Sequence, residues 1–180
     1  QPVTCVCVVQ EEGGGGSMLI TGGADGLVKV WALDFRKADG NIIAPRHHHS
    51  STFHQAPVTC VAGDWDLDIA VSGGGDGVCL VQRLSVQQPI RSIPHPSLRA
   101  LTGLTLSRLG LVTLFSARDN TLHSFDVNGG GGQSVHGGPT PLTFLSHTHD
   151  GKLLLTGNAT GEVVVRCAQT LRACLSFFGE

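Results

Sequence analysis

The chain has 180 residues, of which 41% are hydrophobic and 14% are charged, and its formal net charge is -2. This length and apolar content suffice for one domain with a buried core and exclude a disordered chain. The small net negative charge provides no broad basic face, which excludes nucleic acid as a partner, and the 25 glycines favour a turn-rich, all-β chain.

The first predicted hairpin spans residues 18–31, with the sequence MLITGGADGLVKVW. Two apolar runs flank a Gly-Gly-Ala-Asp-Gly turn, and Asp and Gly tolerate the positive φ angles of tight turns. Val28 and Val30 share one face because alternate residues of a strand point the same way. A further strand-like segment, PVTCVCVV, precedes the hairpin, so residues 1–34 are predicted to form one β unit.

The same pattern recurs three more times. Residues 69–82 read IAVSGGGDGVCLVQ, residues 112–125 read VTLFSARDNTLHSF, and residues 153–166 read LLLTGNATGEVVVR. The turns recur at intervals of roughly 40 to 50 residues, the period of a β-propeller blade. We predict an all-β chain that is part of a propeller, with about four antiparallel, four-stranded blades and essentially no helix. The predicted units are 1–34, 55–86, 98–127 and 139–175.

The segment 35–54 between the first two units is predicted to be an inter-blade loop, because it is polar and has no sustained hydrophobic period. It contains His47, His48 and His49, a composition that raises the question of a metal site. Adjacent residues of an extended chain point apart, and no Cys or carboxylate lies close in sequence. We therefore interpret the histidines as solvated and expect no metal and no cofactor.

The six cysteines form no CxxC pair, so the usual zinc and thioredoxin spacings are missing. Cys5, Cys60 and Cys79 lie within strand-like runs, where we expect small buried hydrophobes, as in a reducing compartment. No apolar run reaches the roughly 18 residues of a membrane span.

The segment TGGADGLVKVW closely resembles the end of a WD repeat, with Trp31 at the Trp of the signature dipeptide. In that family a His, a Ser or Thr, the turn Asp and the Trp form a hydrogen-bonded chain through each blade. The positions of this chain that match the family pattern are Thr21, Asp25, Trp31, His54, Ser72, Asp76, Asp119 and Thr156. Ala32 replaces the signature Asp and Gln82 replaces the second Trp, so the resemblance implies incomplete blade networks.

Residues 55–175 carry a more specific resemblance. The segments VTCVAGDWDLDIAVSGGGDGVCLVQRL, IRSIPHPS, LHSFDVNG and GEVVVRCAQTL, in this order, look like consecutive blades of the C-terminal propeller of BEACH-domain proteins. These beige-like and neurobeachin-like scaffolds act in membrane traffic. The resemblance implies a non-catalytic interaction scaffold with a cytoplasmic location, and it leaves peripheral association with endomembranes open. The implied partners are proteins and other domains of the parent chain, including the BEACH module, which is not in this sequence.

Two other functions stay open. One is a WD-repeat adaptor in another assembly, such as a ubiquitin ligase, and the other is an enzymatic or metal-binding propeller that uses the histidine-rich segment. Ser72, Asp76 and His54 are the residue types of a hydrolase triad, but no GxSxG elbow occurs, and we interpret them as turn residues. We predict that the chain has no catalytic residues and is not an enzyme.

Two expectations concern the surface. Arg83, Arg91 and Arg99, with Arg108 and Arg118, are candidates for a rim that binds an acidic partner or lipid head groups, and scattered solvated charges are the alternative. Complete propellers usually have about seven blades, so four blades leave open sheet edges. We expect the chain to be a fragment that aggregates or folds poorly alone.

Overall fold

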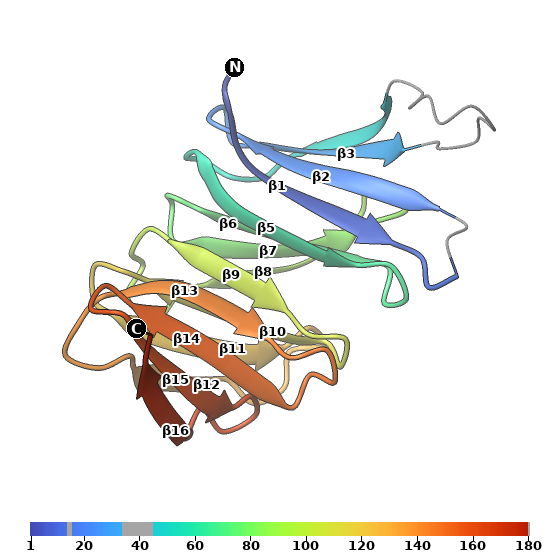
Figure 1. Ribbon diagram of the computed structural model, residues 1–180. Helices are drawn as coiled ribbons and strands as arrows, with labels where there is room; N and C mark the ends of the chain where they lie inside the picture. The colour runs from blue at the N-terminus through green and yellow to red at the C-terminus, as the bar shows by residue number, and fades with distance from the viewer. Residues whose placement is uncertain (14–15, 34–44, 180) are drawn as a thin grey trace.

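The computed structural model describes residues 1–13, 16–33 and 45–179 (Figure 1). Within these ranges the chain forms sixteen β-strands and no helix, and hence no helix that could cross a membrane. The strands build four antiparallel sheets of four strands each, and within each sheet the strands are neighbours in chain order. The predicted all-β fold with four antiparallel, four-stranded blades is confirmed.

The bounds of the strands define the four blades. The first blade contains β1 (Val3–Gln10), β2 (Ser17–Gly23), β3 (Leu27–Leu33) and β4 (Arg46–Thr52). The second contains β5 (Val58–Asp64), β6 (Ile69–Gly74), β7 (Val78–Arg83) and β8 (Pro89–Pro94). The third contains β9 (Gly103–Leu106), β10 (Leu111–Ser116), β11 (Thr121–Asp126) and β12 (Gln133–His136). The fourth contains β13 (Leu142–His147), β14 (Leu153–Asn158), β15 (Glu162–Cys167) and β16 (Ala173–Phe178).

The positions of the fourth strands show that the predicted boundaries of the four β units are wrong. β4 lies inside the predicted loop 35–54, β8 and β12 lie between predicted units, and β16 runs past the end of the last unit. The loop prediction is therefore wrong for residues 46–52, while residues 35–44 lie outside the described ranges. These edge strands are held by backbone hydrogen bonds to the third strand of their blade, so they need no hydrophobic period of their own.

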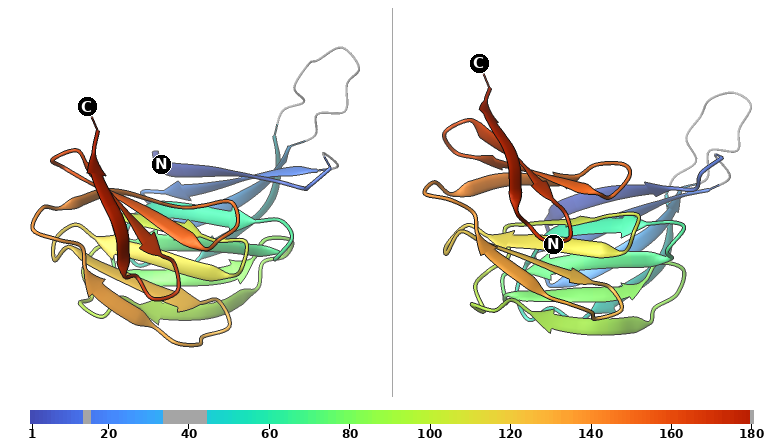
Figure 2. Two further views of the ribbon diagram at one scale, coloured as in Figure 1. Left: turned by 60° about the horizontal axis from the view of Figure 1, so that its bottom comes forward. Right: turned by 90° about the horizontal axis from the view of Figure 1, so that it is seen from below.

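The blades follow one another in chain order around their first strands, with β1 next to β5, β5 next to β9 and β9 next to β13 (Figure 2). A blade is one sheet thick, so it buries its apolar faces against its neighbours. Three hydrophobic clusters result, each centred on one contact between successive blades. Cys60 and Cys79 lie in the middle cluster as free, buried thiols, and burial raises the pKa of both.

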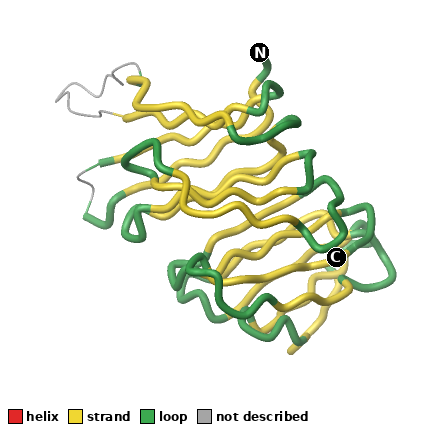
Figure 3. The backbone as a smooth tube through the Cα atoms, turned by 180° about the vertical axis from the view of Figure 1, so that it is seen from behind, coloured by secondary structure: helices red, strands yellow, loops and turns green. Residues whose placement is uncertain are grey.

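The connections gather at the two ends of the strands (Figure 3). The turn between the second and third strands needs a residue with positive φ, and that residue is Gly26 (79°), Gly77 (75°), Asn120 (53°) or Gly161 (84°). Asn tolerates this region better than most residues that carry a side chain. The Asn120 amide also donates to two carbonyls within 138–140 and accepts from the Leu142 amide, at 2.8 to 2.9 Å. It thereby ties the third blade to the start of the fourth.

Candidate functional site

In the second blade the structure brings together the three residues that the resemblance grouped. His54 Nδ1 lies 3.1 Å from Asp76 Oδ2, and His54 Nε2 lies 2.9 Å from Ser72 Oγ. Because a carboxylate only accepts hydrogen bonds, Nδ1 carries the proton and Nε2 accepts from the Ser72 hydroxyl. Asp76 also accepts from the backbone amides of Gln55 and Val78, so the network joins the entry of the blade to its central turn.

Ser72, His54 and Asp76 are hydrogen-bonded in the order of a hydrolase triad. Their burial distinguishes a structural network from a catalytic site. Ser72 is 1% exposed and His54 is 9% exposed, so the hydroxyl has no access to a substrate carbonyl. Burial lowers the pKa of His54, although the Asp76 charge opposes this shift. A neutral, enclosed imidazole fits a structural hydrogen-bonded link.

In the first blade the network divides into two parts. The Trp31 indole N–H donates to Thr21 Oγ1 at 3.0 Å, whereas Asp25 accepts from the Leu27 amide at 3.1 Å. A hollow of about 60 Å³ lies between these groups. The histidine that links the corresponding residues of the second blade has no counterpart among the described residues of the first.

The third blade has a histidine that sequence reasoning missed. His95 is 1% exposed, its Nδ1 lies 2.7 Å from Ser97 Oγ, and its neighbour Asp119 caps the central turn through the Thr121 amide. His95 Nε2 has no hydrogen-bond partner among the described residues. Leu114 occupies the position in the third blade that Ser72 occupies in the second blade. The strand register shows this, because Leu114 pairs with His123 and Ser72 pairs with the equivalent residue Leu80. Leu114 has no hydroxyl group. The segment IRSIPHPS contained the signal, since its His95 precedes the first strand of a blade as His54 does.

Arg166 takes the place of Trp31 in the fourth blade. Its Nε donates to Thr156 Oγ1 at 3.3 Å, and its two Nη groups donate to the carbonyls of Leu171 and Gly137, both at 3.2 Å. Arg166 is 6% exposed, and burial lowers its pKa. An N–H group therefore donates to the threonine hydroxyl in both the first and the fourth blade, from Trp31 in one and from Arg166 in the other. A sequence search for Trp does not detect this equivalence.

The predicted arginine rim is not one surface. Arg83 lies at the end of β7 and donates to Asp68 at 3.2 Å, whereas Arg99 lies beside the turn at the opposite end of the second blade. Arg91 lies within β8 and donates to the Asn128 carbonyl at 3.0 Å. A rim of Arg83, Arg91 and Arg99 is therefore wrong, because antiparallel strands separate residues that follow one another closely in sequence.

The histidine segment also differs from the prediction. His47 stays exposed and lies 2.7 Å from Ser50 Oγ, but His49 is 8% exposed and its Nε2 lies 2.9 Å from the Leu84 carbonyl of the second blade. Alternation along β4 turns His49 toward the second blade, so a solvated role is wrong for this residue. Within the described ranges no group of three or more His, Cys, Asp or Glu side chains is arranged to hold a metal ion.

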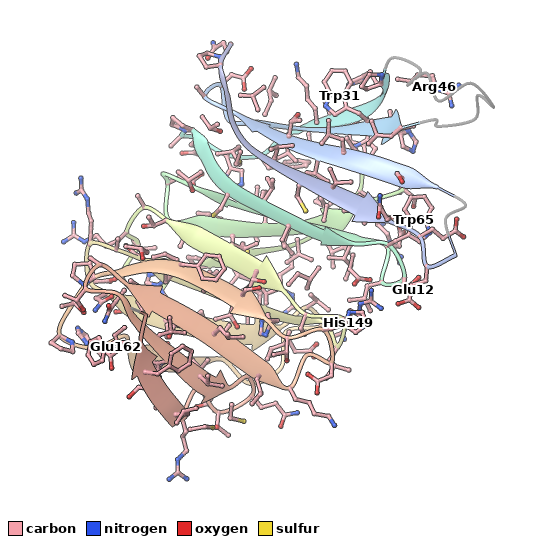
Figure 4. The ribbon with its side chains drawn as sticks, viewed as in Figure 1. Glu12, Trp31, Arg46, Trp65, His149 and Glu162 are labelled. Atoms are coloured by element: carbon pink, nitrogen blue, oxygen red, sulfur yellow. The ribbon has the colours of Figure 1, made fainter. Side chains whose placement is uncertain are left out.

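A polar cavity of about 570 Å³ lies where the first strands of all four blades end. It is lined by residues 8–10, 63–65, 105–108 and 146–149. Trp65 and His149 lie on its wall, and Glu12 is found at the same end of the blades, where it pairs with Arg108 (Figure 4). This combination of an aromatic ring, an ion pair and imidazoles is typical of a binding surface for a polar protein segment.

His147 closes the inner wall of this cavity. Its Nε2 lies 3.2 Å from Thr113 Oγ1, and the Thr113 hydroxyl lies 3.2 Å from Ser124 Oγ, so the contact links the fourth blade to the third. Burial lowers the pKa of His147 to about 4, which keeps the ring neutral near pH 7. The imidazole therefore offers a hydrogen bond rather than a charge.

The chain matches the family described as "Neurobeachin beta propeller domain" over residues 1–179. It is 29% identical over 191 residues to "BEACH domain-containing protein B" of Arabidopsis thaliana, a match that covers 98% of this chain and 7% of that protein. It is also 29% identical over 183 residues to "Protein ROOT INITIATION DEFECTIVE 3" of the same plant, covering 94% of this chain and 40% of that protein. The crystal structure of the computationally designed Ika8 protein is similar in fold, with a TM-score of 0.67 at 20% identity over 100% of this chain and 63% of that one.

Proposed function

We propose, on the premise that this chain belongs to the neurobeachin β-propeller family, that it is a non-catalytic protein-interaction scaffold in membrane and vesicle traffic. The membership confirms the resemblance to the propellers of BEACH-domain proteins. The chain spans 7% and 40% of the two curated relatives, so the activity of a whole BEACH protein enters only as part of this proposal.

The observation that carries the proposal is the cavity at the ends of the first strands. Residues from four blades line one hollow of about 570 Å³, and a binding segment would contact all four blades at once. Rigid strands hold turns in fixed positions, which is how repeat folds present binding surfaces. Expected occupants are partner proteins or the BEACH module, at the cytoplasmic face of endomembranes.

The absence of catalysis is supported by burial of the candidate chemical groups. The Ser72 hydroxyl is enclosed with His54, and the neutral His147 of the cavity wall lies against Thr113, a hydroxyl group that is itself 0% exposed. Neither hydroxyl has the exposure that a nucleophile needs to reach a substrate.

Proximity labelling in cells tests the proposal. The wild-type chain is compared with a double variant at the cavity, Arg108→Ala with His149→Ala. The matched control is Arg99→Ala with Arg118→Ala, two exposed residues at the other end of the blades. We expect endomembrane proteins to be labelled by the wild-type chain and the control but not by the cavity variant. Equal labelling by all three chains would refute the proposed surface.

A second candidate is an adaptor in an assembly outside membrane traffic. It is favoured by the match to Protein ROOT INITIATION DEFECTIVE 3, which has the same 29% identity as the BEACH relative. The same labelling distinguishes the two functions, because an adaptor of this kind would label proteins of another assembly through the cavity and no endomembrane proteins.

A further inference from the structure

The loop between β11 and β12 of the third blade contains an Asn-Gly pair, Asn128 and Gly129. Asn128 is exposed, and it is followed by the run of four glycines at 129–132. Gly129 has a φ of 91°, a region that residues with a side chain rarely adopt. Because Gly129 has no Cβ, no side chain of its own shields its backbone nitrogen from the Asn128 side chain.

An asparagine followed by glycine has an intrinsic reaction that needs no enzyme. The backbone nitrogen of Gly129 loses its proton and attacks Cγ of Asn128, and the side-chain nitrogen takes up a proton and leaves as ammonia. The product is a five-membered succinimide ring, which water then opens. Opening at Cγ gives aspartate, whereas opening at the main-chain carbonyl carbon gives isoaspartate, in which the chain runs through the former side chain.

An arginine of the second blade contacts the peptide bond that would react. Arg91 Nη2 donates to the carbonyl oxygen of Asn128 at 3.0 Å, and its guanidinium lies so close to Gly129 that a Cβ there would collide with it. This carbonyl and the Gly129 nitrogen belong to the same peptide bond. When the nitrogen loses its proton, the negative charge spreads onto the carbonyl oxygen, so a cation bound there stabilises the attacking anion. Within the described ranges no carboxylate forms an ion pair with Arg91.

Two hydrogen bonds hold the loop in its resting conformation. The Gly129 amide donates to the Asp126 carbonyl, and the Asn128 amide donates to Asp126 Oδ1, both at 2.7 Å. The first bond must open before the Gly129 nitrogen can attack. Exposed turns open locally at a low cost in free energy. Arg91 therefore has two opposed effects, because it activates the peptide bond and also restrains the loop.

Two other asparagines serve as internal controls. Asn120 is 8% exposed, its side-chain amide is hydrogen-bonded, and a threonine follows it. The Asn158 side chain donates to Glu162 Oε2 at 3.0 Å, and an alanine follows it. In both cases the next residue has a Cβ and hydrogen bonds hold the side chain in place. Ring closure is therefore disfavoured at these two positions and not at Asn128.

We propose that Asn128 and Gly129 form a self-modification site that converts to aspartate and isoaspartate, and that Arg91 of the neighbouring blade promotes the conversion. The aspartate product adds a negative charge to the loop that Arg91 contacts. The isoaspartate product lengthens the main chain and displaces the carbonyl that Arg91 binds. Either product changes a contact between the second and third blades. The inference is independent of the proposed scaffold function.

Peptide mapping by mass spectrometry tests this inference on the purified 180-residue chain during incubation at pH 7. The wild type is compared with Asn128→Gln, which removes the reacting side chain, and with Arg91→Gln, which removes the cation. Arg99→Gln is the matched control, because Arg99 is exposed at the opposite end of the second blade. Circular dichroism shows whether each variant keeps its sheet structure. The same chains unfolded in urea report the reaction without the contact between blades.

We expect the mass increase of an amide converted to an acid at residue 128 of the wild type and of Arg99→Gln, and none at Asn120 or Asn158. The folded Arg91→Gln chain should convert about five-fold more slowly, which corresponds to about 1 kcal/mol of lost charge stabilisation at an exposed site. In urea its rate should equal that of the wild type.

The other outcomes each overturn part of the inference. A folded wild-type chain in which Asn128 stays intact, or converts no faster than Asn120 and Asn158, overturns the modification site. Equal or faster conversion in folded Arg91→Gln overturns the promoting role of Arg91 and shows that its contact restrains the loop. Slowing of the same size in Arg99→Gln, or slowing of Arg91→Gln that persists in urea, also overturns that role, because neither depends on the contact.

Discussion

His54 and His95 offer a controlled comparison of a complete and an incomplete blade network. Both are buried histidines that precede the first strand of a blade, with exposures of 9% and 1%. His54 forms hydrogen bonds through both ring nitrogens, to Asp76 and to Ser72. His95 forms them to Ser97 through Nδ1, and its Nε2 has no partner in the part of the chain that the structure describes. The perturbation is replacement of each histidine by alanine in an otherwise unchanged chain.

The two substitutions remove similar volumes, so their cavity costs largely cancel. His54→Ala also removes the bond to a carboxylate and leaves the buried Ser72 hydroxyl without its acceptor. A hydrogen bond to a charged group contributes about 1.5 to 3 kcal/mol, and an unsatisfied buried hydroxyl costs about 1 to 3 kcal/mol. His95→Ala removes the contacts of Nδ1 with the Ser97 hydroxyl and the Ser97 amide, both neutral groups. We therefore expect His54→Ala to lower the free energy of unfolding by about 1 to 3 kcal/mol more than His95→Ala does.

Urea unfolding at pH 7 measures this difference, provided that the slope with denaturant is the same for both variants. Equal losses, or a larger loss for His95→Ala, would refute the view that the paired imidazole stabilises the second blade. The double substitution is the consistency check, since sites in separate networks are expected to add within about 0.5 kcal/mol.

Three further predictions follow from single contacts. His147 has its pKa lowered from 6.5 to about 4, so stability should be constant above pH 6.5 and fall as the pH drops from there toward 4, by about 1 to 2 kcal/mol at pH 5. His147→Gln should flatten that part of a thermal stability profile, and an unchanged profile would contradict the assignment. His49→Ala should lower the free energy of unfolding by about 1 to 3 kcal/mol, whereas His48→Ala, on the exposed side of β4, should change it by less than about 0.5 kcal/mol; similar values in urea unfolding would disprove the inter-blade role of His49. Asn120→Gly keeps the left-handed turn but loses three hydrogen bonds, so hydrogen exchange at the Leu142 amide should accelerate, and unchanged protection of that amide would show that the side chain does not hold the connection.

Much of the fold could be predicted because each hairpin carries its own local signals. Alternation in LVKVW and the Asp-Gly turn before it predict two strands and their turn without reference to any other blade. The outer strands were missed for the same physical reason. β4 and β8 are the outer edge strands of their blades and contain Pro, His and Arg. They are held by hydrogen bonds to the neighbouring strand and carry no hydrophobic pattern of their own.

The residues of the candidate site also fall into those that the sequence predicted and those that it did not. His54, Ser72 and Asp76 could be grouped from sequence because a family motif specifies their spacing. His95 was missed although its place before a first strand was a signal, because Leu114 stands where the motif has a hydroxyl. Arg166 could not be found, because it replaces the indole of the motif and only the strand register reveals the equivalence. The arginine rim failed because sequence proximity does not say at which end of a blade a residue lies.

By itself, the sequence determined the strands, the central turns and the repeat that makes four blades, since these depend on local conformational preference and on alternation of apolar residues. Tertiary structure decided which face of each strand is covered, that His49 joins two blades, and that four strand ends enclose one polar cavity. It also left Val163 and Val165 of the fourth blade partly exposed, although the equivalent Cys79 and Val81 of the second blade are buried. Burial depends on contacts between blades, so the sequence of a single strand does not determine which of its residues are buried.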